Sequence, residues 1–150
     1  MIEVSIILVN YNTTALTQAC IASIQTWTKK QTYEVIVVDN ASPDQSIARL
    51  NDQFPEVKLI LSKENLGFGR ANNLGIKEAK GAYIFLLNSD TYLIHDAIAV
   101  FHDYMEQAAH QHVACCGAEL LYPDGKEQMS FGNFPSVLEA FSNLGFFLLY

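Results

Sequence analysis

The sequence predicts an α/β fold in which a mostly parallel central sheet carries helices on both faces. Apolar runs and helical segments alternate four times along the chain with short joints between them, which is the pattern of a parallel sheet built from β-α-β units. The apolar runs are nearly continuous, as in strands buried on both faces. Half of the 150 residues are hydrophobic, which is enough for one domain spanning residues 1–150 with a sizeable core.

The first two strands are predicted at residues 4–9 and 33–38, where apolar side chains dominate. Between them, apolar and small side chains recur at helical spacing, which predicts a helix of roughly four turns. This spacing places Leu16, Cys20 and Trp27 on the inward side of the helix. We therefore expect Cys20 and Trp27 in the core.

A helix and a short strand are predicted next. Ser42, Pro43 and Gln45 have the composition of a helix start with a capping box. The helix that they begin is expected to run to about Gln53. A third strand follows at residues 57–61.

The fourth strand is predicted at residues 83–87, and its continuous apolar character favours a place in the middle of the sheet. The helix before it spans residues 70–80 and is stopped by Gly81. The helix after it begins at Asp96 and runs to about Gln107. The first of these two helices is expected to turn four side chains inward: Ala71, Leu74, Ile76 and Ala79.

In the last part of the chain, the sequence predicts strands joined by a turn. Residues 113–121 indicate a fifth strand or two short ones, and residues 123–125 form a turn from which 126–131 returns as a hairpin arm. From residue 135 the chain is strongly apolar. Because a compact domain seldom ends on such a run, we expect a truncated chain whose missing part covers that surface.

Charge and cysteine content exclude several classes of protein. The net charge of −7 leaves no basic stripe for a nucleic-acid backbone. Three cysteines without a Cys-x-x-Cys pair fit no secreted disulfide framework and indicate a reducing compartment. The start lacks the pattern of a signal peptide, and no apolar run reaches membrane-spanning length. We therefore expect a cytoplasmic protein.

Polar clusters follow each of the four predicted strands, and right-handed crossovers bring them to one edge of the sheet. Ligands of such folds bind in the crevice outside the carboxyl ends of the strands. Helix capping accounts for one or two such clusters but not for all four, whereas the joints at the opposite edge resemble ordinary surface turns. The clusters are Asn10, Tyr11 and Asn12; Asp39 and Asn40; residues 62–69; and Asn88, Ser89 and Asp90.

These residue types suit a ligand that contains a base and a diphosphate. Asp39 can accept a bond from a base imide N–H or a ribose hydroxyl, and Tyr11 offers a flat face for a base. The loop around Gly67 lets the backbone approach a ligand closely, and Arg70 at the next helix start can balance phosphate charge. Asp90 suits a divalent ion that bridges to the diphosphate.

Four motifs together resemble the family 2 glycosyltransferases, and most closely their rhamnosyltransferase-like branch. Each motif alone is weak, but the four occur in the right order and spacing, and the resemblance continues to residue 135. The motifs are Val-Ser-Ile-Ile-Leu-Val-Asn-Tyr-Asn (4–12), Glu-Val-Ile-Val-Val-Asp-Asn-Ala-Ser (34–42), Glu-Asn-Leu-Gly-Phe-Gly-Arg-Ala-Asn-Asn-Leu-Gly-Ile (64–76) and Tyr-Ile-Phe-Leu-Leu-Asn-Ser-Asp-Thr (83–91).

The resemblance implies a three-layer GT-A fold, a UDP- or dTDP-sugar donor, and inverting transfer assisted by Mg2+ or Mn2+. It implies a glycan or a lipid-linked molecule as the acceptor. By position, Asn10, Tyr11 and Asp39 would hold the nucleoside, and the adjoining Asn12 and Asn40 are further candidate substrate-binding residues. The donor pocket would be lined by Asn65, Gly67 and Asn73, and Asn88, Ser89 and Asp90 would stand for the Asp-x-Asp metal motif.

Two departures from the family pattern limit these expectations. Asn88 replaces the first carboxylate of the metal motif, so Asp90 must supply most of the metal affinity. The catalytic base of the family is a carboxylate downstream of the donor half, and after residue 131 the chain holds only Glu139, in a different context. The base is therefore expected beyond Tyr150. A non-catalytic nucleotide-binding or scaffold domain and a nucleotidyltransferase remain alternatives.

Other features have simpler interpretations. The Gly67-x-Gly69 pair follows the third strand, and Asn73 breaks the third-glycine position, which disfavours dinucleotide binding. Cys115 and Cys116 are expected to pack on their strand. The apolar stripe 141–150 is core, a homodimer contact, or a surface for the inner face of a membrane. The four histidines are expected at the surface rather than around zinc: His95, His102, His110 and His112.

Overall fold

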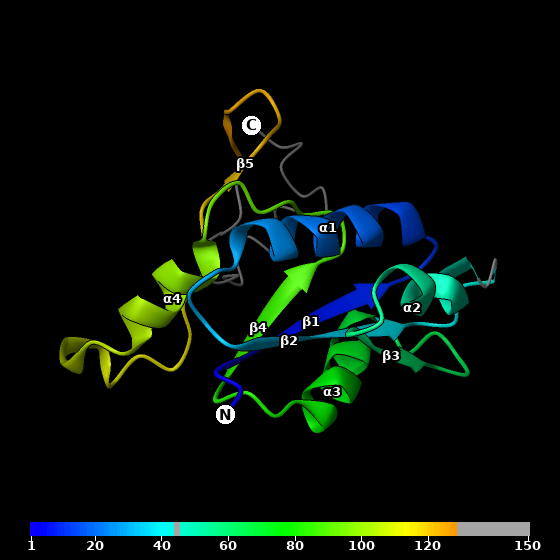
Figure 1. Ribbon diagram of the computed structural model, residues 1–150, viewed down its shortest axis with the longest axis horizontal. Coiled ribbons are helices and arrows are strands. Elements are labelled where there is room, and N and C mark those ends of the chain that lie inside the picture. The colour runs from blue at the N-terminus through cyan, green and yellow to red at the C-terminus, as the bar shows by residue number, and fades with distance from the viewer. Residues whose placement is uncertain (44–45, 129–150) are drawn as a thin grey trace, which may run out of the picture. The chain divides into compact units, whose positions relative to one another are not determined.

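The computed structural model describes residues 1–43 and 46–128 and divides into two compact units, residues 1–112 and 113–150. The first unit contains one parallel sheet in the order β3-β2-β1-β4, whose strands run in the same direction (Figure 1). Its central strands, β1 and β2, pair over their whole length, from Val4 with Tyr33 to Asn10 with Asp39. The strands are β1 (Val4–Asn10), β2 (Tyr33–Asp39), β3 (Lys58–Leu61) and β4 (Tyr83–Asn88).

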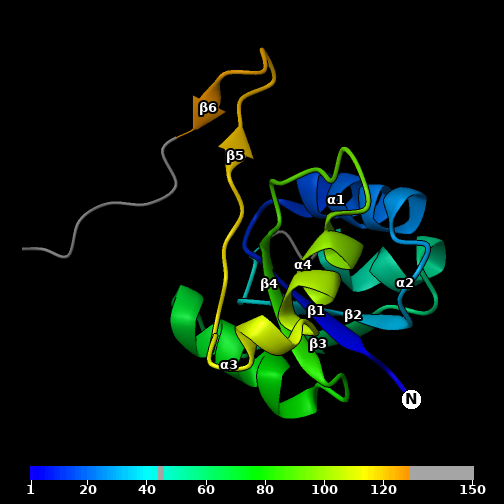
Figure 2. The ribbon, with the colours of Figure 1, turned by 90° about the vertical axis from the view of Figure 1, so that its left-hand side faces the viewer.

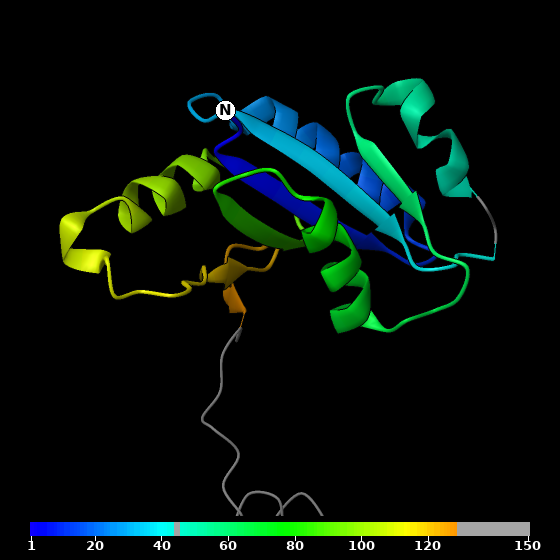
Figure 3. The same cartoon turned by 90° about the horizontal axis from the view of Figure 1, so that it is seen from below.

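Helices cover both faces of this sheet, which confirms the predicted α/β class. Helix α3 lies on one face and α1 and α2 lie on the other (Figure 3). The start of α4 also packs into the core on the α1 side. Among the described residues, no helix is both long and apolar enough to cross a bilayer. The helices are α1 (Thr14–Trp27), α2 (Leu50–Gln53), α3 (Phe68–Glu78) and α4 (Ala97–Met105), with 3-10 turns at Ser46–Arg49 and Ala108–His110.

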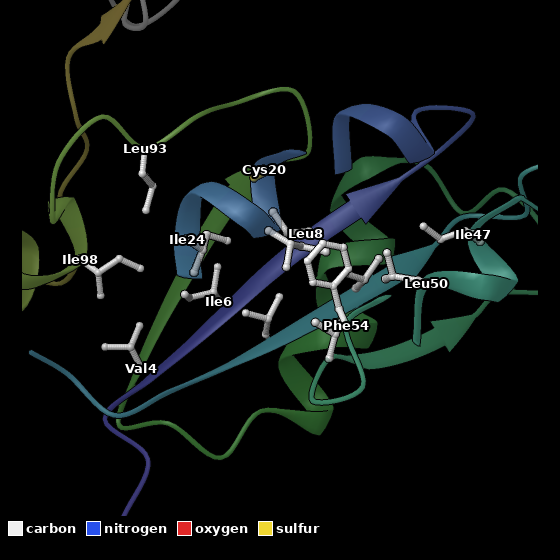
Figure 4. Packing of buried hydrophobic residues seen from close by; sticks show 14 residues of the cluster. Val4, Ile6, Leu8, Cys20, Ile24, Ile47, Leu50, Phe54, Leu93 and Ile98 are labelled. Atoms are coloured by element: carbon white, nitrogen blue, oxygen red, sulfur yellow. The ribbon is translucent and has the colours of Figure 1, made fainter. Parts of the chain in front are cut away.

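The main core fills the space between the sheet and α1. Ile6 and Leu8 of β1 meet Cys20 and Ile24 of α1, and Phe54 closes the side near α2 (Figure 4). The predicted burial of Cys20 is confirmed, because its side chain is fully enclosed.

The predicted burial of Trp27 is wrong, because the residue is 42% exposed. The inward face of α1 consists of Thr17, Cys20, Ile21 and Ile24, and Leu16 is also exposed. Thr17 also lies on this buried face, where its hydroxyl donates to the buried Asn10 side chain.

The segment after β2 is less helical than predicted. The expected capping box includes Gln45, which lies outside the described residues. A 3-10 turn, Ser46–Arg49, leads into a single α-helical turn, Leu50–Gln53. The turn and helix contribute Ile47 and Leu50 to the core.

Helix α3 approaches the sheet very closely and ends two residues earlier than predicted. Its buried residues are Ala71, Asn72 and Gly75, whereas the predicted inward residue Ile76 is 39% exposed. A β-carbon on Gly75 would lie 2.6 Å from Cγ2 of Ile7. The sheet therefore accepts only small side chains from this helix, and the larger Ile76 lies outside.

Strand β4 is at the edge of the described sheet rather than in its middle. Its side chains alternate, with Phe85 and Leu87 packed against the core while Ile84 is 41% and Leu86 is 51% exposed. Helix α3 packs mainly against β1 and β2 rather than against this face of β4. A continuous apolar run does not distinguish an edge strand from a central one.

The joints at the amino ends of the strands are more constrained than the predicted surface turns. The Ser5 hydroxyl donates to Oε1 of Glu34 at 2.6 Å and accepts from the backbone N–H groups of Lys80 (3.2 Å) and Gly81 (2.8 Å). A β-carbon on Gly81 would lie 2.4 Å from the Ser5 backbone nitrogen. We call Ser5, Glu34, Lys80 and Gly81 the amino-edge cluster.

The second unit contains a short antiparallel hairpin, as predicted (Figure 2). Strands β5 (Leu120–Leu121) and β6 (Glu127–Gln128) flank a turn in which Gly125 has a φ of +80°. The strand predicted from residue 113 is wrong up to residue 119, where the backbone is irregular. Cys115 and Cys116 are therefore exposed rather than packed. The predictions for residues 129–150, including the apolar stripe, lie outside the described residues.

Candidate functional site

Side-chain hydrogen bonds connect the ends of β1, β2 and β4 along the carboxyl edge of the sheet. Ser89, after β4, lies 3.2 Å from the Thr13 hydroxyl, which donates to Oδ1 of Asn10 at 3.1 Å. The amide of Asn10 donates to Oδ1 of Asp39 at 2.8 Å. We call Asn10, Thr13, Asp39, Ser42 and Ser89 the carboxyl-edge network. It confirms that the predicted polar clusters at these three strand ends meet.

Asn10 lies at the centre of this network and is completely buried. Its amide nitrogen donates to Asp39 and to the Ser42 hydroxyl. Its amide oxygen accepts from the hydroxyls of Thr13 and Thr17. Two donors and two acceptors are all that an asparagine side chain offers, so Asn10 organises its neighbours, and its predicted contact with a ligand stays a prediction.

Asp39 is 5% exposed, and both of its carboxylate oxygens are held by the protein. Oδ1 accepts from the Asn10 amide and from the Ser42 hydroxyl at 2.5 Å, and Oδ2 accepts from the Ser42 backbone N–H at 3.0 Å. A buried carboxylate needs such donors because desolvation penalises its charge. The acid is therefore fixed in one orientation at the end of β2.

A second set of bonds ties β2 to the loop before α3. Asn40 is buried, and its amide donates to Oδ1 of Asn65 at 2.9 Å and accepts from the Leu66 N–H at 2.8 Å. Oδ1 of Asn65 also accepts from the N–H of Gly67, which has a φ of +75° at the start of α3. The structure thus brings Asn40, Asn65 and Gly67 together, as predicted from the sequence.

The backbone is strained on both sides of this edge. Among the described residues, the two non-glycine residues with positive φ are Asn12 (+55°) and Ala41 (+65°). Asparagine tolerates this conformation, but the alanine costs about 1–2 kcal/mol. Strain of this kind persists only where surrounding contacts hold it, and it is frequent at binding sites.

The predicted metal motif lies in a turn after β4. Asn88 and Asp90 are exposed and Ser89 is half-buried. The Cys20 thiol lies beneath, 3.8 Å from the Asn88 carbonyl oxygen. Burial, with a smaller contribution from the Asp90 carboxylate, raises the pKa of Cys20 to about 12.

The described residues contain no group of three His, Cys, Asp or Glu side chains that could hold a metal by themselves. Mg2+ usually keeps several waters and is held by one or two carboxylates and the phosphates of its substrate. The exposed Asp90 carboxylate, with the Asn88 amide oxygen nearby in sequence, fits that role. Such a site would depend on the phosphates of the ligand.

The remaining predicted site residues lie at the surface. Tyr11 is 45% exposed, and Arg70, in the first turn of α3, makes no ion pair with a described residue. Asn73 is exposed on α3 and joins neither set of bonds, so its predicted place in the donor pocket stays a prediction. One histidine differs from its predicted surface position, because the His102 side chain is 16% exposed and packs edge-on against Tyr83.

An open hollow lies beside the start of α1 and does not coincide with the predicted site. It shares Asn12 and Thr13 with the carboxyl edge but includes neither Asp39, Asn65 nor Asp90. We therefore do not place a ligand there. The hollow is lined by Asn12, Thr13, Thr14, Ala15, Leu16, Gln18 and Arg49.

Sequence reasoning missed three hydroxyl residues at this edge: Thr13, Thr17 and Ser42. The two threonines follow Asn10 by three and seven residues, so that Thr13, just before α1, and Thr17, in its first turn, both present hydroxyls to Oδ1 of Asn10. Ser42 follows Asp39 by three residues, and this spacing allows the aspartate to accept from the serine backbone. Each of these spacings is visible in the sequence, but nothing there distinguishes it from the spacing of an ordinary helix cap or turn.

The parallel sheet and its polar carboxyl edge define an α/β domain of the class that binds ligands at the strand ends. Residues 5–134 match the family described as glycosyl transferase family 2. The chain is also 33% identical over 110 residues to the poly(ribitol-phosphate) beta-glucosyltransferase of Bacillus spizizenii. The aligned region covers 70% of this chain and 17% of that protein. The chain therefore belongs to glycosyl transferase family 2.

Solved structures show the same fold. TarS 1-349 of S. aureus, in complex with UDP-GlcNAc, matches with a TM-score of 0.57 and 27% identity over 69% of this chain and 32% of that one. The mannosyltransferase PcManGT from Pyrobaculum calidifontis, in complex with GDP-Man and Mn2+, matches with a TM-score of 0.62 and 23% identity. That match covers 71% of this chain and 33% of PcManGT. The fold is the GT-A fold of these glycosyltransferases.

Proposed function

We propose that the protein transfers a sugar, with inversion, from a nucleotide-diphosphate donor bound at the carboxyl edge of the sheet. The observation that carries this proposal is the buried carboxylate of Asp39, oriented at the end of β2 by bonds to both oxygens. Membership of glycosyl transferase family 2 supports it, as do the UDP-GlcNAc complex of TarS and the GDP-Man complex of PcManGT.

In this proposal, different described residues bind the nucleoside, the base and the diphosphate of the donor. Asp39 accepts a hydrogen bond from the nucleoside, and Tyr11, exposed in the loop between β1 and α1, stacks on the base. The loop held by Asn40 and Asn65 presents the backbone at Gly67 to the donor. Arg70, without an ion-pair partner among the described residues, offsets the charge of the diphosphate. For the donor we propose a UDP- or dTDP-sugar, as in the rhamnosyltransferase-like branch.

Asp90, with Asn88, would hold the divalent ion. Bound there, Mg2+ or Mn2+ would stabilise negative charge on the diphosphate. We assign no general base within the described residues, and a carboxylate beyond Tyr150 stays the prediction. As the acceptor we propose a glycan or lipid-linked hydroxyl group, met at the inner face of the membrane.

The metal and donor assignments can be tested by calorimetric titration of the complete protein with UDP and dTDP, with and without Mn2+. We expect Asp90→Ala to weaken Mn2+-dependent nucleotide binding by about tenfold or more, equivalent to about 1.4 kcal/mol. Asp103→Ala is the matched control, because it removes the same charge from a side chain that is 60% exposed on α4.

Two results would contradict the proposal. If neither nucleotide binds, the donor site is wrong. If Asp90→Ala and Asp103→Ala behave alike, the metal assignment is wrong. Binding without sugar transfer or donor hydrolysis in the complete protein would instead favour a non-catalytic nucleotide-binding domain.

A further inference from the structure

We propose that Ser42 is a positioning residue that orients Asp39 and the β1–α1 loop toward the nucleoside of the donor. The inference rests on the proposed function and gives a role in the site to a residue that the sequence analysis treated only as a helix cap. Ser42 is 6% exposed and bonds to both Asn10 and Asp39 within the carboxyl-edge network. Because it is buried among protein groups, it acts through its neighbours.

Ser42 holds both oxygens of the Asp39 carboxylate. Its hydroxyl donates to Oδ1 at 2.5 Å and its backbone N–H donates to Oδ2 at 3.0 Å. These two bonds prevent the carboxylate from rotating about its last side-chain torsion. Among the described residues, Oδ2 accepts one hydrogen bond, so a lone pair of this atom stays open to a donor N–H or O–H.

The same hydroxyl also holds a loop that is distant in sequence. It accepts from the backbone N–H of Asn12 at 3.0 Å and from the Asn10 amide at 3.1 Å. Asn12 has a φ of +55°, so this bond fixes the conformation of the residue directly after Tyr11. An ordinary turn would need only the local bonds between Asp39 and Ser42, so the reach to Asn12 indicates a role beyond the turn.

Ser42 also sits beside strained backbone. Ala41, its neighbour, has a φ of +65°, a conformation that relaxes unless the next residue is held. Removing the Ser42 hydroxyl therefore frees the Asp39 carboxylate, the Asn12 N–H and the Ala41 backbone together. We expect the nucleoside contacts to lose their common geometry, although none of the contacting residues is changed.

Ser5 provides a matched control from the opposite edge of the same sheet. Its hydroxyl also donates to a carboxylate of β2, on Glu34, and accepts from two N–H groups. Ser5 is fully buried and is not part of the proposed binding site. Ser5→Ala and Ser42→Ala therefore remove nearly the same set of hydrogen bonds, but at opposite edges of the sheet.

The test is calorimetric titration of the complete protein with UDP and dTDP plus Mn2+, for the wild type, Ser42→Ala, Ser42→Thr and Ser5→Ala. We expect Ser42→Ala to weaken binding about tenfold, Ser5→Ala to stay within about twofold of wild type, and Ser42→Thr, which keeps the hydroxyl, to recover most of the affinity. Folding of each variant is checked by thermal unfolding. If Ser42→Ala does not fold, Ser42→Cys replaces it, because it keeps the volume with weaker bonds.

The outcomes separate this inference from the proposed function. If the wild type binds neither nucleotide, the proposed function fails first. If the wild type binds and Ser42→Ala or Ser42→Cys binds equally well, the positioning role is overturned. If Ser5→Ala weakens binding as much as Ser42→Ala, the effect is one of general stability, and the positioning role is overturned as well.

Discussion

Ser5 and Ser42 make similar hydrogen bonds at opposite ends of one parallel sheet. Each hydroxyl donates to a carboxylate carried by β2, Glu34 near its start and Asp39 at its end. Each also accepts from two N–H groups. The same chemistry therefore occurs twice, and the two settings can be compared directly.

The surroundings of the two serines differ. At the amino edge the bonds close a tight joint, where Gly81 leaves no room for a β-carbon. At the carboxyl edge the bonds hold two residues with positive φ, Asn12 and Ala41. Hydrogen bonds in an unstrained loop mainly stabilise the fold. Hydrogen bonds around strained backbone also hold that backbone in one conformation. The comparison indicates that the first edge stabilises the sheet and that the second holds the conformation of the proposed site.

The largest effect is expected from Gly81→Ala at the amino edge. Its β-carbon would meet the Ser5 backbone nitrogen at 2.4 Å and the Val4 carbonyl carbon at 2.7 Å, and backbone atoms cannot move aside as a side chain can. We expect a loss of about 3 kcal/mol in stability. Hydrogen exchange of the β1 amides in the complete protein measures it.

Gly117→Ala is the control for this substitution. Gly117 has open space around its position and no positive φ, so we expect a change within about 0.5 kcal/mol. Equal effects of the two substitutions would show that the amino-edge joint is not tight.

A smaller effect is expected from Asp39→Asn, compared with Glu34→Gln. Asp39 uses both oxygens as acceptors, so an amide NH2 would face either the Ser42 N–H or the Asn10 amide. The resulting unpaired donors should cost about 2 kcal/mol. In Glu34, Oε1 accepts from both Ser5 and the Lys80 N–H, and a glutamine oxygen can keep both bonds.

We therefore expect Glu34→Gln to cost less than about 0.5 kcal/mol in the same hydrogen-exchange measurement. A larger loss for Glu34→Gln than for Asp39→Asn would reverse the comparison between the two edges.

The smallest effect, and the only stabilising one, is expected from Ala41→Gly. Glycine adopts a φ of +65° without the clash of a β-carbon, and after its greater freedom in the unfolded chain is subtracted we expect a gain of about 0.5 to 1 kcal/mol. Ala22→Gly, exposed within α1, should instead lose about 1 kcal/mol. Thermal unfolding of both variants gives the sign, and a loss for Ala41→Gly would show that Ala41 is unstrained.

The order of the elements and the composition of the carboxyl edge were predictable because they depend on local patterns. Apolar runs marked β1, β2, β3 and β4, and polar residues marked their ends. The rotation of α1 was not predicted, because its buried face includes the polar Thr17, which bonds to Asn10, while the apolar Leu16 and Trp27 are exposed. The edge position of β4 was missed because strand order depends on pairing between distant segments.

By itself, the sequence determined an α/β domain of alternating strands and helices, with Asp39, Asn40 and Asp90 placed at strand ends by the periodicity of the chain. Only the tertiary structure decided which side chains at these strand ends form hydrogen bonds with other protein groups and which remain exposed to solvent. The bond from Asn12 to Ser42 joins residues 30 positions apart, and it forms because β1 and β2 pair in register from Val4 and Tyr33 onward. The local sequence predicts each strand end separately, whereas the register between β1 and β2 brings these ends to within hydrogen-bond distance.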